Sequence, residues 1–130
     1  MKIVWDRVLN LTVWVLQVLL TLMFLYFGAS KLRSDDLFSI AVFAKIGIGQ
    51  WFRYFTGVLE VVCAVMLLVP RTSGIAAALL ACTMAGAVLA HLLVIHDGYA
   101  SIFPGFPLLI LVAIAVKRRS ALFTAKGNST

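Results

Sequence analysis

Long apolar runs separated by short polar stretches dominate the pattern along the chain. Four of these runs cover residues 8–29, 51–69, 74–95 and 102–116. Because an α-helix rises about 1.5 Å per residue, roughly 20 apolar residues cross a hydrocarbon layer about 30 Å thick. The pattern therefore predicts an all-α protein, a four-transmembrane-helix bundle that forms a single membrane domain over residues 1–130. The first run is about twice the length of a signal-peptide core, which favours a retained helix.

The one long linker, between the first two runs, carries helix signals of its own. Ser34 or Asp35 can act as an N-cap, apolar residues follow, and Gly47 and Gly49 mark an end. We predict a short helix at residues 35–46 that lies in the interface on the outer side of the membrane. The alternative is an ordinary loop with a buried apolar edge.

The second and third runs are predicted to form a helical hairpin. They are joined by the tight turn "PRTSG", in which Thr72 or Ser73 can cap the next helix. Small residues then recur at every fourth position of the third run: Gly74, Ala78, Cys82, Gly86 and Ala90. Such a ridge lets a neighbouring backbone approach closely, so we predict that it packs against another helix.

Composition and charge support an integral membrane protein and suggest its orientation. The chain is 63% hydrophobic and 12% charged, with a mean hydropathy of +1.08, whereas soluble domains are about 45–50% apolar. The basic residues on the side of the two termini are Lys2, Arg7, Arg71, Lys117, Arg118, Arg119 and Lys126. Lys31, Arg33, Lys45 and Arg53 flank the other side. Basic residues favour the cytoplasm, so we expect cytoplasmic termini in a bacterial plasma membrane.

The net charge of +6 is explained by this topology and by attraction to anionic membrane lipid. It gives no indication of a nucleic-acid partner.

Glu60 lies at the middle of the second apolar run. An ionised carboxylate at the bilayer centre costs at least a few kcal/mol, so this side chain is expected to be protonated, paired or hydrated. His91 lies toward the outer end of the third run, and side chains lean toward the N-terminus of their helix. Glu60 and His91 therefore lean toward each other, and we predict them as catalytic, proton-transferring residues. A purely structural interhelical hydrogen bond of Glu60 is the alternative.

Residues near Glu60 suggest a ligand pocket in the outer half of the bundle. Tyr54 and Gly57 precede Glu60 on roughly the same helix face, and the missing side chain of Gly57 leaves space. Lys31 ends the first helix and could reach the pocket through water. Arg53 leans away from Glu60, which makes it a weaker partner. We predict Tyr54, Gly57, Lys31 and Arg53 as ligand-binding residues.

Cysteine and histidine positions argue against several other chemistries. Cys63 and Cys82 are predicted to be buried apolar filler, because the chain has no CxxC motif and no cysteine in its outer loops. Disulfide exchange requires an accessible cysteine pair of low pKa. A haem between His91 and His96 fails because both come from one helix end. We therefore predict neither haem nor a metal site.

Several segments of this sequence resemble the DoxX-like family of small four-helix membrane proteins. They are "YFGASKL", "IGIGQWFRYFTGVLEVV", "MLLVP" and "MAGAVLAHL", and the resemblance covers about residues 24–95. The resemblance implies a four-helix bundle. It further implies a membrane subunit of quinone-linked sulfur or thiol oxidation, a partner of a soluble redox enzyme, or an assembly factor for membrane receptors.

Two functional hypotheses follow. In the first, the protein is a redox anchor that binds quinone or another small lipophilic molecule, with Glu60 and His91 relaying protons and Tyr54 or Lys31 orienting the head group. A soluble redox enzyme would then be its partner. In the second, it is a non-catalytic assembly, chaperone or scaffold protein for a membrane client, and Glu60 fixes helix contacts. Either type of protein could form a homo-oligomer.

Overall fold

The structure is all-helical, as the apolar pattern predicts. A computed structural model describes the backbone of residues 2–127 and the side chains of residues 2–118. The helices are α1 (Lys2–Leu32), α2 (Leu37–Ile46), α3 (Gln50–Leu67), α4 (Ser73–Leu89), the π-helical turn η1 (Ala90–Val94) and α5 (Ile102–Gly127). No strand occurs among these residues.

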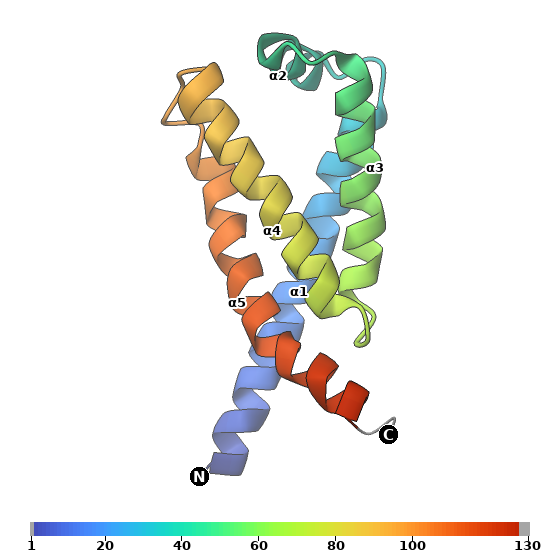
Figure 1. The fold of residues 1–130 in the computed structure, drawn as a ribbon, viewed down its shortest axis with the longest axis vertical. Helices are drawn as coiled ribbons and strands as arrows, with labels where there is room; N and C mark the ends of the chain where they lie inside the picture. Colours follow the sequence, from blue (N-terminus) through green and yellow to red (C-terminus); the bar gives the residue numbers. More distant parts are fainter. Residues whose placement is uncertain (1, 128–130) are drawn as a thin grey trace.

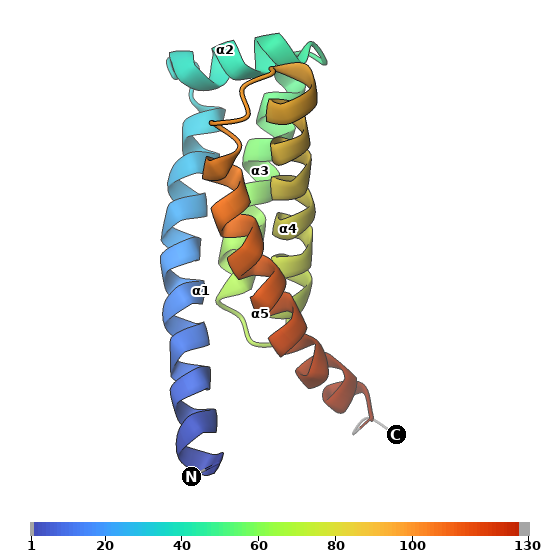
Figure 2. The same ribbon diagram turned by 90° about the vertical axis from the view of Figure 1, so that its left-hand side faces the viewer.

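The long helices form two pairs that spread apart toward one end of the bundle. α1 lies along α3, and α4 lies along α5, as Figures 1 and 2 show. The pairs meet at the end where the 68–72 turn joins α3 to α4, which we call the closed end. At the opposite, open end the short helix α2 lies across the bundle. The start of α1 and the end of α5 lie beyond the closed end.

The hydrophobic core fills the closed end. Its buried members are Leu20, Phe24, Cys63, Ala64, Leu67, Ala76, Ala77, Leu80, Ala81, Met84, Leu111 and Ile114. Two buried polar side chains of α1 also bond to α3 here: the Gln17 amide donates to the Leu67 carbonyl at 2.7 Å, and the Thr21 hydroxyl donates to the Ala64 carbonyl at 3.1 Å. Apolar packing and satisfied polar groups therefore hold this end together.

α1 and α3 are in backbone contact closer to the open end, where Gly28 faces Gly57. A Cβ atom placed on Gly28 would lie 2.9 Å from the Gly57 carbonyl oxygen, and one on Gly57 would lie 2.9 Å from that of Gly28. Only glycine fits at either position without moving a helix. We call this contact the glycine crossing.

Most of the predicted small-residue ridge of the third run does not pack against another helix among the described residues. Gly74 is buried, but Ala78, Cys82 and Gly86 are exposed, and a Cβ atom on Gly86 would meet nothing within 4 Å. The other residues that α4 buries are Ser73, Ala76, Ala77, Leu80, Ala81 and Met84. The larger side chains of Leu80 and Met84 fill the core, and the helix pairs diverge before Gly86 is reached. Of the two cysteines, Cys63 is buried as predicted, whereas Cys82 is exposed.

The helix boundaries differ from the apolar runs where polar residues continue a helix. α1 begins at Lys2 and α5 continues to Gly127, because the flanking polar and basic residues are compatible with helical structure. The helix predicted at residues 35–46 is α2. Its N-cap is Asp36 rather than Ser34 or Asp35, and Gly47 ends it in the left-handed conformation, with φ 83°.

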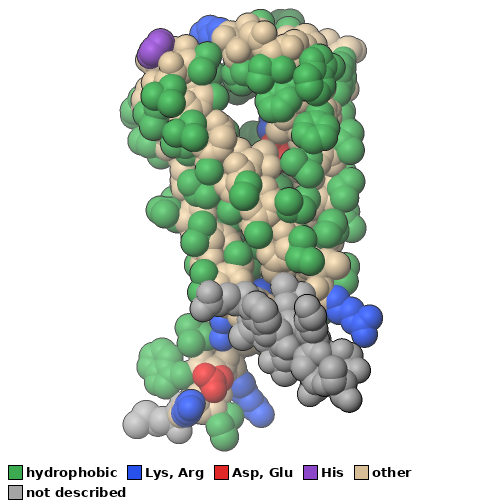
Figure 3. Space-filling view, viewed as in Figure 1, with side chains coloured by type: hydrophobic (Ala, Val, Ile, Leu, Met, Phe, Trp, Pro, Cys, Tyr) green, Lys and Arg blue, Asp and Glu red, His purple; other side chains and the backbone are tan. Residues whose placement is uncertain are grey.

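Apolar side chains cover the outside of the helices as well as the core. Among the described residues, α1 and the continuous segment from Ser73 to Val94 are long and apolar enough to cross a membrane. Hydrophobic side chains dominate the surface in Figure 3. Examples of exposed side chains are Leu22 on α1, Val58 on α3, Leu79 on α4 and Leu109 on α5. A water-soluble domain would bury far more of this surface.

Candidate functional site

A large cavity lies between the two helix pairs at the open end, beneath α2. Its volume is about 1220 Å³, and Figure 3 shows it as a hollow with an acidic and a basic side chain visible inside. Most of its wall is apolar, and the aromatic members are Phe24, Tyr26, Phe27, Phe38, Phe43, Phe52, Phe55, Phe103 and Phe106. A cavity of this size and lining suits a small lipophilic molecule.

Lys31 and Glu60 form an ion pair in the wall of this cavity. The Lys31 ammonium donates to Glu60 Oε1, with Nζ and Oε1 2.5 Å apart. The Glu60 side chain is fully buried, whereas that of Lys31 is 20% exposed. The second carboxylate oxygen, Oε2, is buried and has no hydrogen-bond partner among the described residues. The pair therefore leaves one buried acceptor unsatisfied within a mostly apolar wall.

The glycine crossing explains why these two side chains meet. Lys31 follows Gly28 by three residues on α1, and Glu60 follows Gly57 by three residues on α3. The two helices run in opposite directions, so the charged residues start on opposite sides of the crossing. Each side chain leans back toward the N-terminus of its helix, which brings the ammonium and the carboxylate together.

His91 also lies in the cavity wall, on the π-helical turn. The Ile95 amide donates to the Ala90 carbonyl at 2.9 Å, which is the five-residue spacing of a π-helix, and the Asp97 amide donates to the His91 carbonyl at 2.8 Å. His91 Nδ1 is buried and has no partner among the described residues. Two residues of the cavity wall, Glu60 and His91, thus each carry a buried polar atom without a partner among the described residues. No feature of the sequence pattern predicts the π-helical turn.

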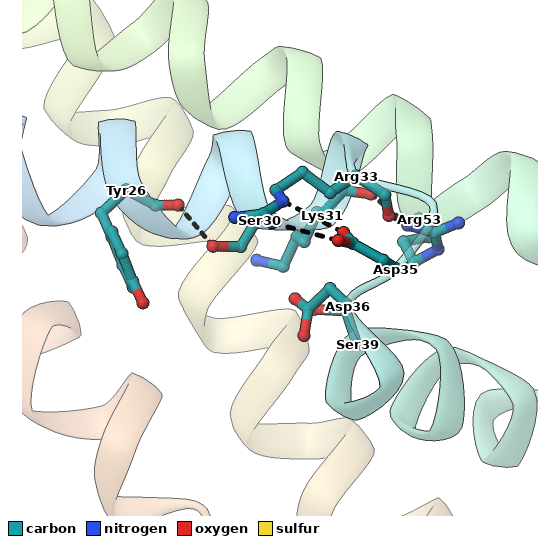
Figure 4. Close-up of polar contacts among 8 residues, drawn as sticks. All are labelled: Tyr26, Ser30, Lys31, Arg33, Asp35, Asp36, Ser39 and Arg53. Atoms are coloured by element: carbon teal, nitrogen blue, oxygen red, sulfur yellow. Dashed lines mark hydrogen bonds and ion pairs between the residues drawn. The ribbon is translucent and has the colours of Figure 1, made fainter.

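Arg53 is buried beside the C-terminal end of α1 and does not line the cavity. Its guanidinium donates to the Lys31 carbonyl, to the Arg33 carbonyl at 2.9 Å and to the Gln50 side chain at 2.7 Å. It also stacks over the ring of Tyr54 at 4.3 Å from the centroid. Figure 4 shows Arg53 next to this end of the helix. The guanidinium therefore satisfies carbonyl groups that the helix itself leaves without donors.

The structure separates the six sequence-predicted site residues into two groups. Lys31, Glu60 and His91 share the cavity wall. Tyr54 and Arg53 lie outside the lining, because Arg53 turns to the end of α1 and Tyr54 packs under it. Gly57 also lies outside the lining, because it faces α1 in the glycine crossing. The site roles of all six residues stay predictions.

Asp36 is a cavity residue that sequence reasoning missed. It lines the wall near Lys31, and its Oδ2 accepts a hydrogen bond from the Ser39 hydroxyl at 2.7 Å. In the sequence, Asp36 is an acidic residue at the start of a helix with Ser39 three positions later. This arrangement is typical of a helix N-terminus and could have indicated Asp36. In the described part of the chain, no group of three or more His, Cys, Asp or Glu side chains is placed to hold a metal ion.

We expect Arg53→Gln to lower the free energy of unfolding by about 2 kcal/mol, because carbonyl groups at the end of α1 lose a charged donor. Arg33→Gln is the matched control, since the Arg33 side chain is largely exposed and pairs with Asp35 in solvent. Thermal unfolding in detergent, followed by tryptophan fluorescence, measures both variants. Equal stability of the two variants would contradict the role of Arg53 at this helix end.

Comparison with known proteins identifies the family of this chain. The sequence profile of the DoxX-like family matches residues 15–115. The chain belongs to the DoxX-like family. The matched region contains Lys31, Glu60 and His91 and all of α2, α3, α4 and η1. No curated protein and no solved structure matches the chain.

Membership of the DoxX-like family and the apolar outer faces of the helices together indicate an integral membrane protein. Contact with membrane lipid follows from the same two observations. As in other membrane proteins, an ionisable residue deep in the helices of this DoxX-like protein suggests function, so Glu60 is the natural starting point.

Proposed function

We propose that this DoxX-like protein spans the membrane four times, through α1, α3, the α4–η1 segment and α5, as a single domain. α3 is 18 residues long and therefore extends about 27 Å, nearly the thickness of the hydrocarbon layer. Its two charged residues, Arg53 and Glu60, have their partners inside the protein. α2 would then lie in the outer interface, with both termini in the cytoplasm of a bacterial cell.

Within this arrangement the cavity would bind a lipophilic molecule with a polar head group, and we favour a quinone. The observation that carries this proposal is the Lys31–Glu60 pair, which places an ammonium and a carboxylate with an unsatisfied oxygen in the wall of a mostly apolar cavity. A quinone offers the complementary chemistry, because its ring and tail are apolar and its carbonyl oxygens accept hydrogen bonds. Lys31 would donate to one of these oxygens.

The protein would serve as the membrane subunit of a redox system. Reduction of a quinone to a quinol takes up one proton for each electron. The electrons would come from a partner redox enzyme, and Glu60 and His91 would transfer the protons at the head group. Both side chains lie in the wall of one cavity, and each has an unsatisfied polar atom, which supports this assignment.

Glu60→Gln is expected to weaken binding of a short-tailed quinone by at least about tenfold, which corresponds to about 1.4 kcal/mol. The neutral amide keeps the size of the side chain but removes both the charge beside Lys31 and the titratable group. Titration of the purified protein in mild detergent measures the affinity. Tyr54→Phe is the control, because Tyr54 does not line the cavity.

Two outcomes would argue against this function. One is a wild-type protein that binds no quinone, and the other is a Glu60→Gln variant that binds as tightly as wild type. Native mass spectrometry of the same preparations identifies copurifying molecules. A membrane client recovered without any small molecule would favour the assembly or scaffold hypothesis.

A further inference from the structure

The full burial of Glu60 raises the question of how a proton reaches it. On the side of the closed end, α1 and α3 pack tightly against each other with Phe24, Cys63 and Ala64 at most 1% exposed. The polar groups of Gln17 and Thr21 in that half are bonded to carbonyl groups of α3. A path for protons from the closed end would have to break this packing.

A second, small pocket lies on the other side, next to the large cavity. Its volume is about 190 Å³, and its wall consists of Tyr26, Ser30, Arg33, Asp35 and Asp36. Tyr26, Ser30 and Asp36 line both spaces, so the two are neighbours with a shared wall. Figure 4 shows Ser30, Arg33, Asp35 and Asp36 near the segment that joins α1 to α2, with Lys31 among them and Tyr26 farther back along α1.

Polar and charged side chains line the small pocket from its outer edge to the shared wall. At the edge, the Arg33 guanidinium donates to both oxygens of Asp35 at 3.1 Å, and both side chains are about two-thirds exposed. The hydrogen bond and the positive charge of Arg33 hold the pKa of Asp35 below its usual value. The Arg33–Asp35 pair therefore keeps the outer edge charged and hydrated at neutral pH, and the Asp36 and Ser30 side chains extend the polar lining to the shared wall.

We propose that this small pocket is an aqueous inlet through which protons travel between the surface at the 33–36 segment and Glu60. Its volume suits several water molecules with polar partners on every side. Asp36 also lines the large cavity, whose wall contains the Lys31–Glu60 pair, so water in the inlet would reach that wall at Asp36. The inlet rests on the proposed function for its purpose in quinone chemistry, but water access itself is independent of any ligand.

Proton access to Glu60 is accordingly one-sided. The charged or titratable groups that share the cavity wall with Glu60 are Tyr26 and Lys31 from α1, Asp36 from the segment before α2, Cys82 from α4 and His91 from η1. The charged side chains and the histidine among them belong to the open end, Cys82 lies midway along α4, and α5 contributes no such group to the lining. Protons consumed at the head group would thus be drawn from the compartment that α2 faces.

Cysteine labelling tests the inlet directly. In a Cys63→Ser, Cys82→Ser background, Ser30→Cys places a thiol in the shared wall, and Leu22→Cys on the same helix places one on the exposed apolar surface. Sealed vesicles are prepared with the protein in each of its two orientations across the membrane. Both preparations are treated with a membrane-impermeant cationic thiosulfonate. We expect Ser30→Cys to react at least about tenfold faster than Leu22→Cys, and only from the side of α2, because the thiolate forms only where water enters.

A rate for Ser30→Cys equal to that of Leu22→Cys would overturn the inlet, and so would faster labelling from the side of the termini. These results are separable from those of the quinone titration. Rapid one-sided labelling with no quinone binding would retain the inlet and reject the proposed ligand. Quinone binding without labelling would retain the ligand and reject the inlet.

Discussion

Lys31→Met is expected to lower the free energy of unfolding by about 3–5 kcal/mol, the cost of leaving a buried charge without its partner. The Glu60 carboxylate is fully buried, and its only hydrogen-bond partner among the described residues is the Lys31 ammonium. Methionine keeps most of the length and packing of the lysine side chain, so the variant removes the charge with little loss of volume. Reversible unfolding in mixed detergent micelles measures the change.

The double variant Lys31→Met, Glu60→Gln is the decisive comparison. Once Glu60 is neutral, the loss of Lys31 no longer strands a charge, and we expect the double variant to be more stable than Lys31→Met alone. If the destabilisation of the double variant equals the sum of the two single effects, the pair is not energetically coupled, and the ionic account of this site fails.

The second large effect is expected for Gly57→Val, at about 3 kcal/mol of lost stability. A Cβ atom at this position would lie 2.9 Å from the Gly28 carbonyl oxygen and 3.1 Å from the Lys31 Cβ atom. The obstacle includes backbone, so the two helices have to separate. That separation also moves Lys31 away from Glu60, and we therefore expect quinone affinity to fall together with stability.

Gly86→Val is the matched control for this substitution. It introduces the same side chain into a helix, with the same change in helix propensity, but a Cβ atom there meets nothing within 4 Å. Thermal unfolding and quinone titration are carried out on both variants. The comparison separates the effect of the close helix contact at Gly57 from the effect of helix propensity. Equal losses at both positions would show that the glycine crossing does not require glycine.

The helices themselves could be predicted from the sequence because their signals are local. Apolar runs mark α1, α3, α4 and α5, and the turn residues around Gly47 mark the end of α2. Helix direction and depth also placed Glu60 and His91 at one pocket; both line the cavity, whereas Tyr54 and Gly57, which were predicted for the same pocket, lie outside its lining. These inferences needed only the rise per residue and the lean of side chains along a helix.

Other features depend on tertiary contacts that no local pattern encodes. The small residues around Gly86 suggested a packing ridge, but the divergence of the helix pairs leaves this part of α4 without a neighbour on that side. Arg53 was predicted to bind a ligand; its guanidinium bonds to carbonyl groups at the end of α1, a contact that the sequence pattern did not indicate, and its ligand-binding role stays a prediction. Lys31 was expected to reach the pocket through water, whereas the close approach at Gly28 and Gly57 brings it into direct contact with Glu60.

The divergence of the two helix pairs divides the molecule into a rigid and a compliant half. At the closed end, a continuous core resists any relative displacement of the helices. At the open end, a cavity separates the pairs, and small changes in their separation disrupt few contacts. Under the proposed function, such a cavity would adjust its width to head groups of different size while the core stays intact, and selectivity would depend more on the charges of Lys31 and Glu60 than on shape.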